Sequence, residues 1–209
     1  MFKKFQAFLV VLIFFIGLII NTALADSHPV IGKVSVAKGS VELFRNKQRI
    51  GSVESGEVLV LGDIIKTGQR ARVLITLNDK TELTIGRESQ VKLEDYAFTP
   101  KRQALVLDIP KGWFLYKSGD IAKKSPDSVK LVSEFATIGV RGTKIWGAMV
   151  EHECAVYVED GVASVMNDYG SVVLEHGDGT RVQGAGVAPS SVKPWGKKAI
   201  RTIKREVSL

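Results

Sequence analysis

The segment 136–147, ATIGVRGTKIWG, holds the residues whose types and spacing most invite a chemical interpretation. Its central cation, Arg141, lies between two glycines in a run of strand-forming residues. Glycine lets a strand turn or lets another backbone come close. A guanidinium there can hold adjacent strands through an acid, such as Glu134, or through backbone carbonyls, and it can equally bind a ligand carboxylate or a glycan. We favour the architectural role. The candidate site residues are Gly139, Val140, Arg141, Gly142 and Thr143.

His152 and Cys154 form the second pair of reactive side chains. On a strand, side chains two residues apart point to the same face, and here that face also carries Val150, Val156 and Val158. We therefore expect a core cysteine beside a tolerated histidine. Two ligands do not make a zinc site, and a nucleophilic thiolate needs exposure and a low pKa. With no serine elbow or acid–base set elsewhere, the sequence predicts no catalytic residue, no metal and no cofactor.

The elements that must position these residues are short strands. Apolar residues alternate in segments such as 71–77 and 105–109, and turn signals separate the segments about every 8–12 residues. This pattern is typical of an all-β sandwich, barrel or solenoid. Asp160-Gly161 is predicted to be a hairpin turn, and the polar segment 121–129 an exposed loop.

The N-terminal segment predicts export. Lys3 and Lys4 precede an apolar run over residues 8–20, and the sequence Ala-Leu-Ala ends at residue 25. This arrangement indicates a secretory signal peptide cleaved after Ala25. An uncleaved anchor in the inner membrane is the alternative. Both place the remaining chain in the periplasm.

The C-terminal segment 191–209 accounts for most of the positive charge. The whole chain has a net charge of +7, and this segment alone carries six lysines and arginines against one glutamate. The rest shows no electrostatic footprint for nucleic acid. Residues 199–207 place Ile200, Ile203 and Val207 on one face of a short basic helix. That helix could cap the open end of the β-core, or it could bind anionic lipid or an acidic partner.

Three segments together resemble the FecR domain family of bacterial envelope proteins. The first is GDIIKTG followed by ARVLITLNDKTELTIGRESQVKL, the second is ATIGVRGTKIWG, and the third is AVYVEDGVASVMNDYGSVVLEHGDGTRV. The match extends roughly over residues 34–187. The resemblance implies an all-β domain, either a twisted β-sandwich or a short β-solenoid, which we expect to carry a short C-terminal helix. We therefore expect a signal peptide over 1–25, a FecR-like domain over 26–190 and a basic tail over 191–209.

The resemblance also implies a function. Signalling members of the family relay the state of an outer-membrane receptor to a sigma factor. We expect here a stand-alone exported FecR-domain protein, a non-enzymatic interaction, signalling or adaptor module whose partner is another envelope protein. The alternative is binding of peptidoglycan or an exported polysaccharide, for which solvent-facing aromatics are the indicator: Trp113, Tyr116, Trp146, Tyr157 and Trp195. A cryptic hydrolase has the least support. We expect no nucleic-acid partner, and membrane contact only through the basic tail or an uncleaved N-terminal segment.

Overall fold

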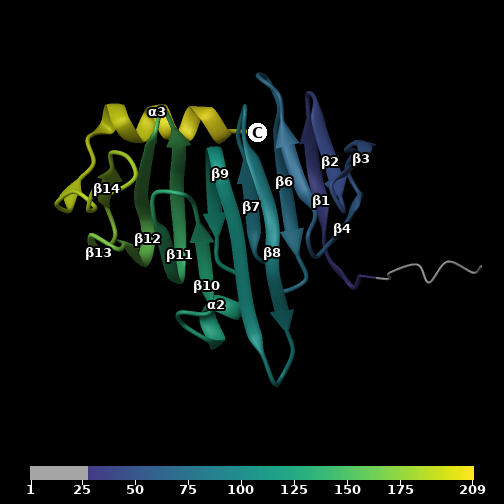
Figure 1. Ribbon diagram of the computed structural model, residues 1–209, viewed down its shortest axis with the longest axis horizontal. Helices are drawn as coiled ribbons and strands as arrows, with labels where there is room; N and C mark the ends of the chain where they lie inside the picture. The colour runs from purple at the N-terminus through teal and green to yellow at the C-terminus, as the bar shows by residue number, and fades with distance from the viewer. Residues whose placement is uncertain (1–27) are drawn as a thin grey trace, which may run out of the picture.

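Alternating apolar residues build a large open β-sheet in the computed structural model, which describes residues 28–209 (Figure 1). The predicted signal peptide lies outside the described residues. The strands are β1 Val30–Lys38, β2 Val41–Arg45, β3 Gln48–Ser52, β4 Val58–Val60, β5 Ile64–Thr67, β6 Arg72–Leu77, β7 Glu82–Ile85, β8 Gln90–Phe98, β9 Gln103–Lys117, β10 Val129–Val132, β11 Thr137–Val150, β12 Glu153–Asn167, β13 Gly170–Leu174, β14 Asp178–Val182 and β15 Lys193–Pro194. The helices are α2 Asp120–Lys124 and α3 Lys197–Val207. No helix in this part of the chain is long and apolar enough to cross a membrane.

The strand pairing divides the sheet into two layers. The first layer follows the order β3, β2, β5, β8, β9, β10, β11, β12 and β13, using residues 103–111 of β9, 137–141 of β11 and 162–167 of β12. The second layer follows β4, β1, β6, β7, β9, β11, β12, β14 and β15, using residues 112–117, 144–150 and 153–160 of the shared strands. The three longest strands therefore run through both layers.

Each of these long strands bends at a glycine with positive φ. The bends lie at Gly112 in β9 with φ +109°, at Gly142 in β11 with φ +58°, and at Gly161 in β12 with φ +83°. Residues with a side chain rarely adopt this backbone region, whereas glycine enters it freely. The β11–β12 register also shifts between Arg141 and Ile145, where the two bends meet. These glycines allow one strand to serve two layers.

The predicted hairpin turn at Asp160-Gly161 is wrong. Both residues lie inside β12, at its bend between the layers. The hairpin that joins β11 to β12 turns instead at Glu151 and His152, which both have positive φ, +52° and +63°. Two consecutive residues with positive φ are typical of a tight two-residue hairpin turn.

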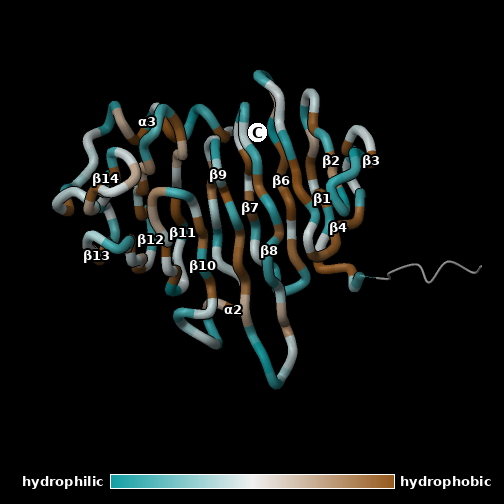
Figure 2. Tube along the Cα trace, viewed as in Figure 1, coloured by the Kyte–Doolittle hydropathy of each residue, from teal (hydrophilic) through white to brown (hydrophobic). Residues whose placement is uncertain are grey.

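A single apolar core fills the space between the layers. Side chains such as Leu43, Ile75, Leu107 and Val156 are 0–1% exposed and belong to one contiguous cluster. Apolar and polar residues alternate along the central strands (Figure 2). The predicted all-β fold is confirmed, as an open twisted sheet with a short C-terminal helix.

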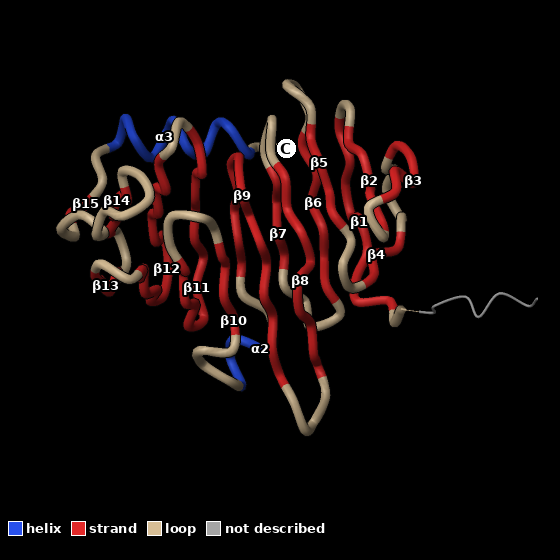
Figure 3. The backbone as a smooth tube through the Cα atoms, in the orientation of Figure 1, coloured by secondary structure: helices blue, strands red, loops and turns tan. Residues whose placement is uncertain are grey.

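Of the two helices (Figure 3), α3 lies outside this core, whereas α2 contributes Ile121 and Ala122 to it. The prediction that 121–129 is an exposed loop is wrong in its first part, because residues 121–124 belong to α2 and Ile121 and Ala122 are buried. Helix α3 runs across β12 and β11 toward β9 (Figure 1). Its buried residues Ile203 and Val207 pack in a second cluster on the outer face of the second layer. Of the two roles left open for the tail, capping is nearer to the structure, but the helix covers a face of the sheet and not an open end.

Candidate functional site

The five candidate residues lie on β11 at its bend. Val140 is fully buried in the core. Gly139 faces Ser164 of β12, whose Oγ lies 2.6 Å from the position that a Cβ at residue 139 would take. A side chain at 139 therefore requires Ser164 to move. Val140 and Gly139 thus shape the β11–β12 contact and do not face a ligand cavity.

Arg141 forms an ion pair with Asp127, in the loop between α2 and β10. Its Nε and Nη2 donate to the two carboxylate oxygens of Asp127 at 2.8 and 3.0 Å, the fork geometry of a bidentate pair. Both side chains are exposed, by 59% and 67%. The sequence left the partner of Arg141 open, with Glu134 as the acid near it in sequence, and the structure shows that the partner is Asp127. The pair fastens a loop to β11 at the surface.

Gly142 and Thr143 line a hollow at the surface. This is an open groove of about 520 Å³ at the bend, lined by Glu82, Thr84, Leu115, Lys117, Ser118, Lys123, Gly142, Thr143, Lys144 and Asp160. The backbone N–H of Thr143 donates to Ser118 Oγ at 2.8 Å, and Ser118 N–H donates to the Thr143 carbonyl at 3.0 Å. These bonds fix the bend of β11 against the end of β9.

The groove carries charges of both signs. Lys117 pairs with Glu82 at 3.2 Å, and Lys144 pairs with Glu159 at 2.9 Å. These lysines are therefore already engaged by carboxylates. The arrangement can attract a polar or charged ligand group, and it places no nucleophile beside a base. Within residues 28–209, no three histidine, cysteine or acidic side chains gather to hold a metal ion.

Two aspartates of the first family-like segment also serve the architecture. Asp63 is fully buried and accepts two 2.8 Å hydrogen bonds from Arg45 and one of 2.9 Å from the Val60 N–H. Asp79, also fully buried, accepts bonds from Thr81 and from the Ile121 N–H. Each buried charge is satisfied by donors, which is the condition for stable burial. These aspartates tie turns to strands and to α2.

The expected pairing of His152 with Cys154 on one strand face is wrong. His152 is exposed in the hairpin turn, whereas Cys154 is fully buried in β12. Burial raises the pKa of the Cys154 thiol to about 12. A thiol of this kind is not a nucleophile at neutral pH. The predicted core role of Cys154 thus agrees with its position.

The aromatic side chains considered for glycan binding are mostly covered. Tyr116, Trp146 and Tyr157 are at most 7% exposed. Trp195 stacks on Tyr157 with ring centroids 5.7 Å apart, and the Arg181 guanidinium lies over its ring. Trp113 and Trp195 are half-buried and line a groove of about 660 Å³ beside α3. The aromatic surface therefore serves mainly to seat the helix.

Sequence patterns missed two acidic residues on which α3 depends. Glu206 accepts a 2.6 Å bond from Arg87 Nε and a 3.1 Å bond from Arg205 Nη2. Glu159 of β12 accepts bonds from Trp146 Nε1 at 2.8 Å, from Lys144 and from Lys204 of α3. Glu206 and Arg87 are 119 residues apart, so no local motif marks the pair. Only the amphipathic pattern of the tail pointed to this region.

Comparison with known proteins supports the family that the motifs suggested. Residues 63–164 match the family model described as FecR protein, which includes the bends at Gly112, Gly142 and Gly161. No curated protein matches the chain. Two crystal structures of a candidate anti-sigma factor from Parabacteroides distasonis share the fold, each with a TM-score of 0.54 and 13% identity.

The likeness to these crystal structures covers 66% of this chain and 62% of the other. The chain therefore spans less than two thirds of that protein, and at this identity the likeness concerns the fold. The family model confirms the resemblance over its matched part: residues 63–164 match the FecR family.

Proposed function

We propose that this protein is a non-enzymatic regulatory module of the bacterial envelope that acts by binding another protein. The observation that carries the proposal is the FecR match over residues 63–164. The structures with the same fold come from a candidate anti-sigma factor, and an anti-sigma factor works by protein contact. The family match and the fold support a regulatory or signalling role. The envelope partner is part of the proposal.

A free sheet edge supports protein binding. Among the described residues, β13 pairs only with β12, which leaves its other edge without a backbone partner. Beside this edge Tyr169 is 62% exposed and Val173 is 60% exposed. Such an edge can accept an added strand from another protein, with alternate side chains providing specificity. The proposed partner segment is therefore extended and carries apolar side chains.

The proposed location is the periplasm. It rests on the predicted signal peptide over residues 1–25, which lies outside the described residues. Cell fractionation with cytoplasmic and periplasmic marker proteins tests it. Recovery with the periplasmic markers supports export, and recovery with the cytoplasmic markers contradicts it.

Glycan binding is the alternative function, and the aromatic residues give it less support. A sugar ring needs a free aromatic face. Trp146 lies under the ammonium groups of Lys144 and Lys204, at 5.7 and 5.0 Å from its ring centre. Trp195 is engaged by Tyr157 and Arg181. Trp113 and Trp195 are the half-buried tryptophans, and since Trp195 is engaged, Trp113 is the better candidate to contact a glycan.

Crosslinking of the tagged protein in intact host cells tests the proposed function. The informative variant is Val173→Lys, because a charged side chain beside the free edge disfavours strand addition. Val58→Lys is the matched control, since Val58 is 48% exposed on the edge strand β4 of the other layer. We expect one envelope protein to co-purify with the wild type and the control, and its yield to fall at least about tenfold with Val173→Lys. Co-purification of glycan without a protein would overturn the proposal.

A further inference from the structure

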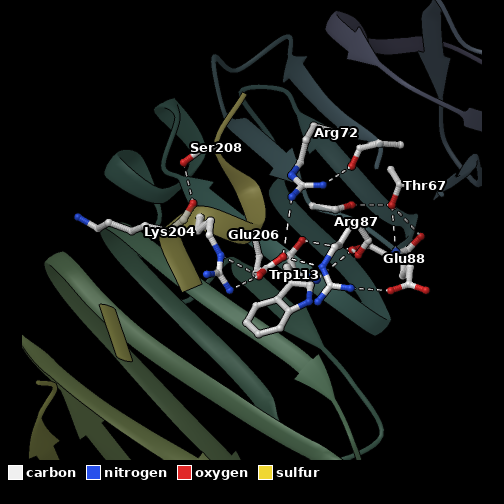
Figure 4. Close-up of polar contacts among 12 residues, drawn as sticks. Thr67, Arg72, Arg87, Glu88, Trp113, Lys204, Glu206 and Ser208 are labelled. Atoms are coloured by element: carbon white, nitrogen blue, oxygen red, sulfur yellow. Dashed lines mark hydrogen bonds and ion pairs between the residues drawn. The ribbon is translucent and has the colours of Figure 1, made fainter. Parts of the chain in front are cut away.

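The last turn of α3 lies against two arginines of the FecR-matched region, Arg72 and Arg87 (Figure 4). Its residue Glu206 is 6% exposed and accepts a 2.6 Å bond from Arg87. The Arg72 guanidinium lies farther off, with Nη2 3.9 Å from the same carboxylate. The carboxylate of the helix thus neutralises two cations contributed by the sheet.

The apolar part of the contact follows one stripe of the helix. Ile203 and Val207 are each 2% exposed, and Ile200 packs beside them. They contact the outer face of the second layer, which we call the helix seat: Trp113, Leu115, Trp146, Ala148, Val150, Ala155 and Tyr157. The Gly86 position allows the last turn to approach, because a Cβ there would lie 2.6 Å from the Glu206 carbonyl oxygen. The seat is therefore shaped for a helix.

Arg72 is incompletely satisfied by α3. Its Nε is buried and has no hydrogen-bond partner, although a buried donor of this kind normally has one. Burial also lowers the pKa of Arg72, against the opposing effect of Glu206. A carboxylate placed nearer to Arg72 would supply the missing acceptor. Helix α3 therefore leaves one buried donor of Arg72 without an acceptor.

Helix α3 has little stability of its own. It has 11 residues, and helices of this length are marginal in water without packing. Its N-cap residue, Gly196, makes no side-chain cap, and its first turn contains Lys197 and Lys198 and no acid. The glycine provides no side-chain acceptor for the first amides, and the two lysines are unfavourable near the positive end of the helix dipole. The helix therefore persists mainly because it is docked.

We propose that the helix seat, together with Arg72 and Arg87, is a docking surface for an amphipathic helix of a partner protein that carries an acidic side chain, and that α3 occupies this surface as a built-in competitor. The partner helix would repeat the spacing of Ile200, Ile203 and Val207, with an acid at the position of Glu206. This inference rests on the proposed role in protein binding. It concerns a surface other than the β13 edge, and it adds regulation by displacement.

Hydrogen exchange of the full-length protein tests whether α3 opens by itself. We expect α3 amides to exchange at least about tenfold faster than amides of residues 145–149 in β11, because a docked cover opens without global unfolding. Glu206→Gln should accelerate α3 exchange about tenfold further and leave β11 unchanged, since it weakens charged hydrogen bonds. Asp95→Asn is the control, because it removes an exposed ion pair with Arg102 on the β8–β9 hairpin. Equal exchange rates for α3 and β11 in every variant would overturn the inference.

A second variant separates docking from charge. Gly86→Ala removes no charge and places a methyl group against the end of α3. It should also accelerate α3 exchange by about tenfold. Unchanged exchange with both Gly86→Ala and Glu206→Gln would show that neither contact holds the helix.

A peptide tests the docking surface in trans. The probe is a fluorescent peptide of residues 197–209, and the host is the full-length chain with Ile203→Asp, whose own helix has lost its apolar anchor. We expect the peptide to bind this variant at least about tenfold more tightly than the wild-type chain, and Arg87→Ala in the same variant to weaken binding about tenfold. Binding that is equal with and without Arg87, or equal to the wild-type chain, would overturn the inference.

The outcomes distinguish this inference from the proposed function. If α3 opens and the peptide binds while no protein crosslinks in cells, the displacement surface stands and the function in protein binding fails. If a protein crosslinks at the β13 edge while α3 exchanges only with global unfolding, the function stands and the displacement surface fails.

Discussion

Gly161 lies against the backbone of Gly142, and neither position can carry a side chain without strain. A Cβ built at residue 161 would lie 2.3 Å from the Gly142 carbonyl oxygen and 2.7 Å from the Thr143 Cγ2 atom. Both glycines have positive φ. The VRGT segment and the Asp-Gly pair of β12 are therefore two sides of one crossing, where both strands pass between the layers. The contact requires glycine at 161, whereas the glycine directly after Arg141 is required by its positive φ of +58°, because a Cβ at residue 142 would meet no atom within 4 Å.

Substitution at this crossing should be costly. Gly161→Ala combines a strained backbone with a steric clash, and we expect a loss of more than about 2 kcal/mol in the free energy of unfolding. Gly56→Ala is the matched control, because Gly56 also has positive φ, +97°, but an added Cβ there meets no atom within 4 Å. It should cost about 1 kcal/mol. Urea denaturation measures both, and equal losses would contradict the role of close approach.

The Arg141–Asp127 pair should contribute little to stability. Both side chains are more than half exposed, and exposed ion pairs contribute at most about 1 kcal/mol. Arg141→Ala, Asp127→Ala and the double variant form a cycle whose coupling energy we expect below about 1 kcal/mol. A coupling above about 2 kcal/mol would show that the pair is a main support of the bend.

Cys154 should be unreactive in the folded protein. Burial raises the pKa of its thiol to about 12, so almost no thiolate exists at pH 8. We expect iodoacetamide to modify Cys154 in urea and not in native buffer, as measured by intact-mass spectrometry. Modification of the native protein at the rate of a free thiol would contradict the buried position.

The ion pairs of Glu159 should stabilise the protein above acidic pH. Burial alone would raise the pKa of this carboxyl, but hydrogen bonds from Lys204, Lys144 and Trp146 outweigh that effect and lower it from 4.5 to about 2. Because the folded pKa lies below the unfolded one, the stabilisation is fully present above about pH 4.5 and is lost as the pH falls toward 2.

Thermal melting of wild type and Glu159→Gln measures this effect. We expect the wild type to melt higher by no more than about 4 °C at pH 7, since the carboxylate is only partly buried. The difference should shrink between about pH 4.5 and pH 2. A difference that does not change over this range would show that the charge of Glu159 is not its cause.

The sequence predicted the fold class because apolar alternation is a local signal. It did not predict which two residues form the turn between β11 and β12. Asp160-Gly161 has ideal hairpin composition, yet the pairing of β12 with β11 extends through it, and the turn falls at Glu151-His152. Local turn propensity was overridden there by a long-range register, which composition does not contain.

The candidate site was predicted only as a segment. The glycines around Arg141 indicated either a turn or a close backbone approach. Gly142 shows the turn, with φ +58° and open space at its Cβ position, and the close backbone approach lies at Gly161 of the neighbouring strand. The partner of Arg141 could not be named, because Asp127 lies in a loop whose position depends on α2. The Glu206–Arg87 pair joins residues 119 positions apart, and its existence depends on where the helix docks. Such contacts arise from tertiary packing.

Site-specific photocrosslinking in host cells tests the central claim, protein binding, most directly. A photoreactive residue would replace Val173 beside the free edge of β13, and Val58 on β4 would carry it in the control. The account predicts a single adduct with one envelope protein from position 173 and none from position 58. The absence of any protein adduct at 173, or the same adducts at both positions, would contradict it.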